Sequence, residues 1–215
     1  MWLLFFGGIV VSGVYETFDA WSYTKVGLFL VLTPILVPLL FPSVSGEAGI
    51  PWYDRFTTKA NAFIFIFSWI GNYFWTHYFY KVLGTDYTFP AHRLNDVPIA
   101  CTFITHSYFH LYHGIAAIGI RALWRKIAHK SQTAQFLIMA LTMVAAGYFT
   151  AFMEVATISS FPYYTYKDAW AMWVIGSGFY GMYFLLSFPW FTRIDEEVDT
   201  YDKKTDKVIP AKRWS

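Results

Sequence analysis

The chain has 215 residues, of which 56% are hydrophobic and only 14% carry a charge. Soluble domains carry about 25% charged residues, so this chain has too few charges to cover a water-facing surface of its size. The net charge of +2 is too small to suggest a nucleic-acid partner, and the single cysteine, Cys101, excludes an internal disulfide and a multi-cysteine metal site. The composition indicates an integral membrane protein in a lipid bilayer, and no obligate protein partner is evident.

The predicted membrane spans are apolar stretches close to the roughly 20 residues that a bilayer requires. The first, Met1 to Tyr15, is short, but it has no basic start and no obvious cleavage site, so we expect a retained span. The longer stretches cover 26–46, 60–80, 97–120, 131–166 and 169–192. Lipid offers the backbone no hydrogen-bond partners, and these lengths do not fit a barrel. The predicted fold class is all-α, a polytopic membrane helical bundle of five to six transmembrane helices, with a kink at Pro34 and Pro38.

The loops divide the basic residues unevenly, which predicts an orientation. We expect a single transmembrane domain over residues 1–192 and a polar cytoplasmic tail over 193–215. Twelve Lys and Arg lie in alternate loops and the tail, and four lie in the other loops. The positive-inside rule then places the basic loops and both termini in the cytoplasm. The membrane would be the endoplasmic reticulum in a eukaryote and the inner membrane in a bacterium.

Glu154 is the single charge within the predicted span 131–166. Ionisable groups are costly inside a membrane, so they are functional by default. Thr150 and Thr157 share its helix face, and Gly147 and Ala151 would let a neighbouring helix approach closely. A carboxyl group kept neutral by apolar surroundings can donate a proton. The alternative is a structural glutamate that hydrogen bonds with a neighbouring helix.

Three histidines, His106, His110 and His113, lie on one face of the predicted span 97–120, because their spacing is i, i+4, i+7. They could bind a metal, relay protons or form hydrogen bonds between helices. Three ligands from one straight helix converge poorly on a single ion, so we expect no metal site.

The span 60–80 ends in a run of aromatic and polar residues that includes Asn72 and His77. An aromatic belt at the membrane interface explains the rings. It does not explain Asn72, which needs either a partner on another helix or a cavity. These patterns alone leave open acid catalysis on an apolar substrate or a proton-coupled transporter.

An ordered set of strings decides between these possibilities. It includes Tyr15-Glu16-Thr17-Phe18, Lys59-Ala60-Asn61, Asn72-Tyr73-Phe74-Trp75-Thr76-His77-Tyr78-Phe79, Asn95-Asp96-Val97-Pro98, Thr105-His106, Tyr112-His113, Glu154, Phe161-Pro162-Tyr163-Tyr164, Tyr180, Tyr183-Phe184 and Arg193-x-Asp195-Glu196. The set resembles the cycloeucalenol cycloisomerase family of cyclopropyl sterol isomerases. His110 departs from the family, since plant members are apolar there, and this argues against a three-histidine metal site.

The resemblance implies an isomerase of sterol biosynthesis that converts a 9β,19-cyclopropyl sterol to a Δ8 sterol, as in cycloeucalenol to obtusifoliol, without a cofactor. An acid protonates carbon 19, the ring opens toward a cation at carbon 9, and a base removes the proton from carbon 8. We expect Glu154 to be the acid, and His106 or His113 to tune it or to act as the base.

The substrate of this reaction needs apolar walls and an anchor. We expect Asn72 and His77 to line the sterol pocket or to anchor the 3-hydroxyl group. Tyr73, Trp75 and Tyr108 are candidates for the aromatic wall that stabilises the cation.

Three alternatives belong to other classes. The first is a sterol-binding or transport protein without enzymatic activity. The second is a metal-dependent membrane oxidase that uses His77, His106, His110 and His113. The third is a sterol double-bond isomerase that moves an alkene by similar acid chemistry.

Overall fold

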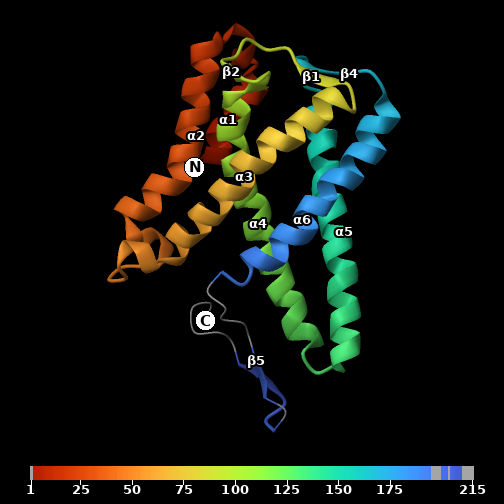
Figure 1. The fold of residues 1–215 in the computed structure, drawn as a ribbon. Coiled ribbons are helices and arrows are strands. Elements are labelled where there is room, and N and C mark those ends of the chain that lie inside the picture. Colours follow the sequence, from red (N-terminus) through yellow and green to blue (C-terminus); the bar gives the residue numbers. More distant parts are fainter. Residues whose placement is uncertain (1, 195–199, 203, 210–215) are drawn as a thin grey trace. The chain divides into compact units, whose positions relative to one another are not determined.

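The computed structural model describes residues 2–194, 200–202 and 204–209. These residues form α1 (Trp2–Ser12), α2 (Ala20–Leu40), α3 (Phe56–Lys81), α4 (Ile99–Ile127), α5 (Gln132–Ile158) and α6 (Ser177–Phe191), with short 3-10 turns at Val14–Thr17, Pro42–Ser45 and Trp52–Asp54. A π-helical turn, Ala171–Gly176, runs directly into α6. The predicted all-α class is confirmed (Figure 1).

Helix α5 buries small residues and exposes large apolar ones. On α5, Phe136, Leu141 and Phe149 are 64% to 71% exposed, whereas Gly147 and Ala151 are buried. Water would penalise this arrangement, but lipid favours it, because close helix packing in a membrane depends on small residues at the contacts. Helix α2, helix α5 and the π turn together with α6 are each long and apolar enough to cross a membrane. The predicted membrane bundle is confirmed.

The chain forms two compact units. Unit 1 comprises residues 1–110 and 158–172, and unit 2 comprises residues 111–157 and 173–215. The predicted single domain over 1–192 stays a prediction. The predicted tail is described only in part, because 195–199, 203 and 210–215 lie outside the described residues, and with them Asp195-Glu196 of the family-like strings. Within it, β5 (Thr200–Asp202) pairs antiparallel with β6 (Lys207–Ile209).

Helix α2 begins at Ala20, and the predicted start at residue 26 was wrong. The side chain of Asp19 caps the helix, since its Oδ1 accepts a hydrogen bond from the backbone N–H of Ser22 at 2.8 Å. The helix therefore includes Lys25, which the charge-free criterion had placed in a loop. Helix α2 ends at Leu40 and is followed by a 3-10 turn, so the predicted end at residue 46 was also late.

Two prolines inside α2 create acceptors for its neighbours. A proline has no N–H, so Pro34 and Pro38 leave the carbonyls of Leu30 and Pro34, four residues earlier, without their helix donors. Ser107 of α4 donates to the Leu30 carbonyl at 2.6 Å, and Nδ2 of Asn61 in α3 donates to the Pro34 carbonyl at 3.0 Å. The prolines thus join α2 to α3 and α4. The predicted kink stays a prediction.

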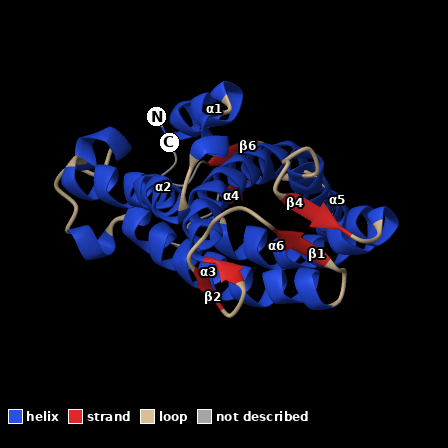
Figure 2. Cartoon of the chain, turned by 90° about the horizontal axis from the view of Figure 1, so that it is seen from above, coloured by secondary structure: helices blue, strands red, loops and turns tan. Residues whose placement is uncertain are grey.

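Short strands outside the helices were not predicted from the sequence. β1 (Thr85–Tyr87) pairs antiparallel with β4 (Tyr164–Tyr166), and β2 (Arg93–Leu94) pairs with β3 (Val97–Pro98) (Figure 2). Helix α5 therefore ends at Ile158, not at residue 166 as predicted. Pro162 disfavours helical backbone in the residues around it. We call residues 82–98 and 159–168, which lie in unit 1, the loop cap.

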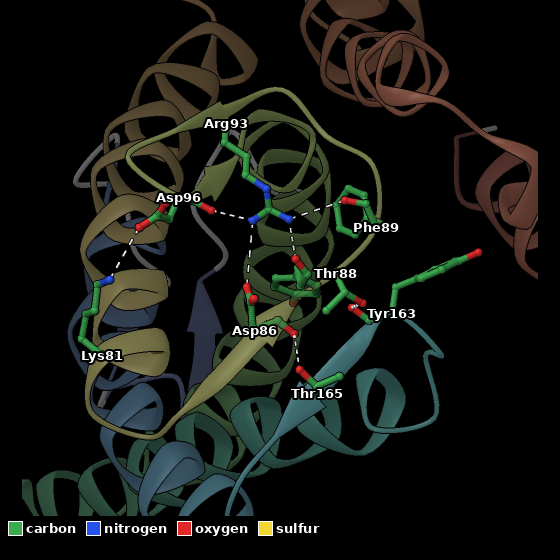
Figure 3. Close-up of polar contacts among 9 residues, drawn as sticks. Lys81, Asp86, Thr88, Phe89, Arg93, Asp96, Tyr163 and Thr165 are labelled. Carbon is green, nitrogen blue, oxygen red and sulfur yellow. Dashed lines mark hydrogen bonds and ion pairs between the residues drawn. The ribbon is translucent and has the colours of Figure 1, made fainter.

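Arg93 holds together the first segment of the loop cap, residues 82–98 (Figure 3). Its Nη1 donates to the Asp96 carbonyl at 2.7 Å, and its Nη2 donates to the carbonyls of Tyr87 and, at 3.5 Å, Phe89. Nη1 also lies 3.9 Å from Oδ1 of Asp86. A planar guanidinium can direct its N–H groups at several acceptors at once, which a lysine ammonium cannot do in the same plane.

Candidate active site

Glu154 of α5 is held by two tyrosines within unit 2. The hydroxyl of Tyr180 in α6 donates to Oε2 of Glu154 at 3.2 Å, and the side chain of Tyr112 in α4 also hydrogen bonds with this carboxyl group. Each phenol offers one O–H donor, so both hydroxyls can support the negative charge that the carboxyl group acquires when it loses its proton. The site can therefore hold a carboxyl group in one orientation and stabilise its charged form.

A close helix crossing brings Tyr180 to Glu154. A Cβ atom added at Gly147 of α5 would stand 2.7 Å from the carbonyl oxygen of Gly181 in α6, nearer than such atoms come in proteins. The expected close approach at Gly147 is thus confirmed. Since Tyr180 adjoins Gly181 and Glu154 lies two turns from Gly147, the crossing sets the distance between the hydroxyl and the carboxyl group.

His113 lies in the same unit, fully buried among aromatic rings. Its Nε2 is 2.8 Å from the hydroxyl of Ser187. The ring centroids of Phe188 and Phe191 lie 5.0 and 5.2 Å from that of the imidazole. These contacts place an imidazole that can accept or donate a proton in largely apolar surroundings.

Phe184 connects the carboxyl site with the histidine. This side chain is fully buried, and its ring centroid lies 4.9 Å from that of Tyr180, 5.9 Å from that of Tyr112 and 6.1 Å from that of His113. The rings that bind Glu154 and the imidazole of His113 therefore share one aromatic neighbour. Such a ring presents an electron-rich face to a developing cation.

In unit 1, Asn61 of α3 bridges the other two histidines to α2. Its Oδ1 lies 3.2 Å from Nε2 of His106 and 2.8 Å from Nε2 of His110. Its Nδ2 donates to the carbonyls of Pro34 at 3.0 Å and Thr57 at 2.9 Å. The side-chain amide thus uses two donors and two acceptors, which is its full hydrogen-bonding capacity.

This arrangement determines where the histidines carry hydrogen. Carbonyl oxygens only accept, so the amide nitrogen of Asn61 must face them and the amide oxygen must face the imidazoles. Nε2 of both His106 and His110 is therefore protonated. Nδ1 of His106 lies 3.3 Å from the buried hydroxyl of Ser68, so both ring nitrogens of His106 have partners within unit 1. Among the described residues, no group of three His, Cys, Asp or Glu side chains could hold a metal ion.

A comparison with curated proteins places the chain in a family. Cycloeucalenol cycloisomerase of Arabidopsis thaliana is 40% identical to this chain over 203 residues, a match that covers 94% of the chain and 72% of the relative. The chain belongs to the cycloeucalenol cycloisomerase family. No protein-family model matches the chain, and no solved structure matches it. The resemblance expected from the ordered strings is confirmed.

Within this member of the cycloeucalenol cycloisomerase family, the polar residues predicted at the end of α3 have partners in unit 1. Nδ2 of Asn72 donates to the Thr105 hydroxyl at 2.7 Å, and its Oδ1 accepts from the Thr76 hydroxyl at 3.3 Å. Of the two alternatives for Asn72, the partner on another helix is observed. Nδ1 of His77 lies 2.9 Å from the carbonyl oxygen of Tyr73, one turn earlier.

The three predicted wall residues also lie in unit 1. The Tyr73 hydroxyl accepts a hydrogen bond from Nδ2 of Asn95 at 2.7 Å. The ring of Trp75 packs edge-on against that of Tyr78, and Tyr108 packs against Trp2 and Phe6 of α1. Unit 2 holds Glu154 and His113, whereas unit 1 holds the other predicted site residues, which are His106, Asn72, His77, Tyr73, Trp75 and Tyr108.

Roles for Tyr112, Tyr180, Phe184 and Asn61 were not predicted from the sequence. All four stand within the family-like strings, so a signal was present. The signal was the position of each residue within the ordered strings. Residue type and helical periodicity do not distinguish these four from the many other aromatic and polar residues of the chain.

Proposed function

We propose that this chain is an isomerase that opens the 9β,19-cyclopropane ring of a sterol, in the manner that the name of its relative, cycloeucalenol cycloisomerase, describes. The observation that carries the proposal is the carboxyl group of Glu154, held by Tyr112 and Tyr180, whose rings both pack against that of Phe184. Ring opening by protonation requires a positioned acid and an electron-rich wall, and unit 2 supplies both.

In the proposed reaction, the Glu154 carboxyl group donates its proton to carbon 19. The electron pair of the bond between carbons 9 and 19 forms the new C–H bond, so carbon 19 becomes a methyl group and carbon 9 a cation. Loss of a proton from carbon 8 leaves its electron pair to form the double bond between carbons 8 and 9. One proton is gained and one is lost, so the reaction needs no redox partner and no cofactor.

The two phenols support the first step. As the proton leaves, the hydroxyls of Tyr112 and Tyr180 donate to the carboxylate and stabilise its charge. Hydrogen bonds to a charged group are worth about 1.5–3 kcal/mol, more than those to a neutral one. The pair therefore favours the transition state over the ground state, as catalysis requires.

We propose His113 as the base for the second step, because it lies in unit 2 with Glu154 and packs on Phe184, the ring that also contacts the two tyrosines that bind Glu154. Neutral imidazole has a basicity suited to proton transfer near neutral pH. His106 has both ring nitrogens in the network of Ser68 and Asn61, so we assign it the positioning of α3 against α4.

The remaining residues are proposed to shape the sterol pocket. Asn72 and His77 are proposed to line it, and Tyr73, Trp75 and Tyr108 to supply aromatic walls. A cation in contact with a ring face gains about 2 kcal/mol when water is excluded. The substrate enters from the bilayer, and the basic loops and both termini face the cytoplasm. The membrane is the endoplasmic reticulum if the source is eukaryotic and the inner membrane if it is bacterial.

Glu154→Gln tests the acid role. General acid catalysis contributes about 10²- to 10⁴-fold, so turnover of cycloeucalenol by the purified variant in sterol-containing micelles should fall by at least about 10²-fold. Thr150→Val is the matched control, because Thr150 lies one turn away and its hydroxyl donates to the Ala146 carbonyl of its own helix. Tyr180→Phe should lower kcat by roughly ten- to a hundredfold with little change in KM. Near wild-type turnover by folded Glu154→Gln would remove the acid role.

A further inference from the structure

Ser177, at the start of α6, carries a buried hydroxyl group that none of the described residues satisfies. Its exposed fraction is 0%, and its Oγ has no hydrogen-bond partner among them. Other hydroxyls in unit 2 differ, since those of Thr142 and Thr150 donate to carbonyls of their own helix and that of Ser187 pairs with His113. A buried hydroxyl without a partner is unfavourable, so such a group points to a ligand.

The helix before Ser177 explains why its hydroxyl is not used locally. A serine within an α-helix commonly donates to the carbonyl four residues earlier. For Ser177 that carbonyl belongs to Trp173, inside the π turn Ala171–Gly176, where the helix is wider than an α-helix. π turns are frequent at functional sites, because they change the direction of side chains without ending the helix.

Ser177 lies about one helical turn before Tyr180, the α6 residue that binds Glu154. Ser177 and Tyr180 are i, i+3 neighbours on the buried face of α6, and helical side chains lean toward the N-terminus, so the ring of Tyr180 leans over the turn of Ser177. Helices α5 and α6 run in opposite directions (Figure 1) and cross at Gly147 and Gly181. Moving from Gly181 back to Ser177 therefore follows α5 forward toward Glu154.

We propose that the Ser177 hydroxyl binds the 3-hydroxyl group of the sterol. In a sterol, carbon 3 and carbon 10 stand at opposite corners of ring A, and carbon 19 is attached to carbon 10. The 3-hydroxyl and the atom to be protonated are thus about one ring apart, which is close to one helical turn of about 5.4 Å. Ser177 is one turn from Tyr180, the residue that binds Glu154. The inference rests on the proposed role of Glu154 as the proton donor.

A single anchor at this position would orient the substrate. The 3-hydroxyl is the polar group of an otherwise apolar molecule, and apolar pockets fix their ligands through a small number of placed polar groups. With the hydroxyl at Ser177, ring A lies across the interval between Ser177 and Glu154, so carbon 19 is presented to the acid. A sterol without the 3-hydroxyl group would contact the same apolar side chains, but carbon 19 would not be held in a fixed position relative to Glu154.

Ser177→Ala tests the proposal with two substrates, cycloeucalenol and its 3-deoxy analogue. One neutral hydrogen bond corresponds to a change of roughly three- to tenfold, so KM for cycloeucalenol should rise by that factor while the 3-deoxy analogue is turned over as by the wild type. The melting temperature should stay the same or rise, because the variant removes an unsatisfied buried hydroxyl. Thr142→Val is the control for loss of a hydroxyl elsewhere in unit 2, and neither KM nor melting temperature should move.

Two further variants separate this proposal from the acid role. Ser177→Cys keeps the size of the side chain with a weak donor, and should lose affinity for cycloeucalenol in the same direction as Ser177→Ala. Glu154→Gln should lose kcat on both substrates while still discriminating between them in binding. An unchanged KM in Ser177→Ala, or an equal loss on both substrates, overturns the anchor. Normal turnover by Glu154→Gln would overturn the acid role of Glu154. The comparison of cycloeucalenol with its 3-deoxy analogue would then still decide whether Ser177 binds the 3-hydroxyl group.

Discussion

Replacing Asn61 by leucine should weaken the attachment of α2 to α3 and α4. Leucine is close to asparagine in size, so the change removes hydrogen bonds without leaving a large cavity. The Pro34 carbonyl, which has no helix donor because Pro38 follows four residues later, loses the amide nitrogen that binds it. Nε2 of His106 and Nε2 of His110 lose their shared acceptor.

The size of the effect follows from these three interactions. Hydrogen bonds between membrane helices average about 0.6 kcal/mol each, which gives a loss of about 2 kcal/mol. Donors or acceptors left without partners in a dry interior cost about 1–3 kcal/mol each, which raises the loss to about 3 kcal/mol or more. We therefore expect the free energy of unfolding of Asn61→Leu to fall by about 2–4 kcal/mol.

Titration of the purified protein with SDS in mixed micelles, followed by circular dichroism, measures this free energy. Thr33→Val is the matched control, because the Thr33 hydroxyl donates only within α2, to the Phe29 carbonyl at 2.7 Å, and its loss should change stability by less than about 0.5 kcal/mol. A value for Asn61→Leu within that same limit would refute the reasoning that the amide joins the three helices.

Two other substitutions test the contacts that shape each unit. Gly147→Ala should lower the free energy of unfolding by about 1–3 kcal/mol, because the added Cβ would stand 2.7 Å from the Gly181 carbonyl oxygen. Gly178→Ala is the control, because a Cβ there has open space and the change should be neutral or stabilising. Equal stabilities of the two variants in an SDS titration would contradict the close crossing of α5 and α6. Arg93→Lys should make the loop cap more sensitive to limited proteolysis, because a lysine cannot bind the carbonyls of Tyr87 and Asp96 together. Lys81→Ala is the control, because it removes only an exposed ion pair and should be cleaved like the wild type.

The sequence predicted the helices better than their ends. Uninterrupted apolar stretches identify where helices must form, because lipid leaves the backbone no other partner. The ends depend on local capping groups, which charge-free stretches do not reveal. The Asp19 side chain, for example, caps α2 so that the helix begins at Ala20 and not at residue 26. The pairing of β1 with β4 joins segments about 80 residues apart, Thr85 with Tyr166, so no local pattern reveals it.

Of the candidate site, the sequence predicted the ionisable residue, Glu154, but not the neutral tyrosines that bind it. Glu154 stands out because a carboxyl group in an apolar helix needs a reason. Tyr112 and Tyr180 do not stand out among 16 tyrosines, and the helix face that meets Glu154 is decided by the crossing at Gly147. Helical spacing likewise placed His106 on one face with His110, but their partner Asn61 comes from another helix.

Product analysis by gas chromatography–mass spectrometry tests whether Glu154 opens the cyclopropane ring of the sterol by protonation. The purified chain and its Glu154→Gln variant, both shown to be folded, are incubated with cycloeucalenol in micelles. We expect the wild type to form an isomer of unchanged mass with a double bond between carbons 8 and 9, and the variant to leave the cyclopropane intact. Unchanged cycloeucalenol with the wild type, or equal product with both proteins, would contradict it.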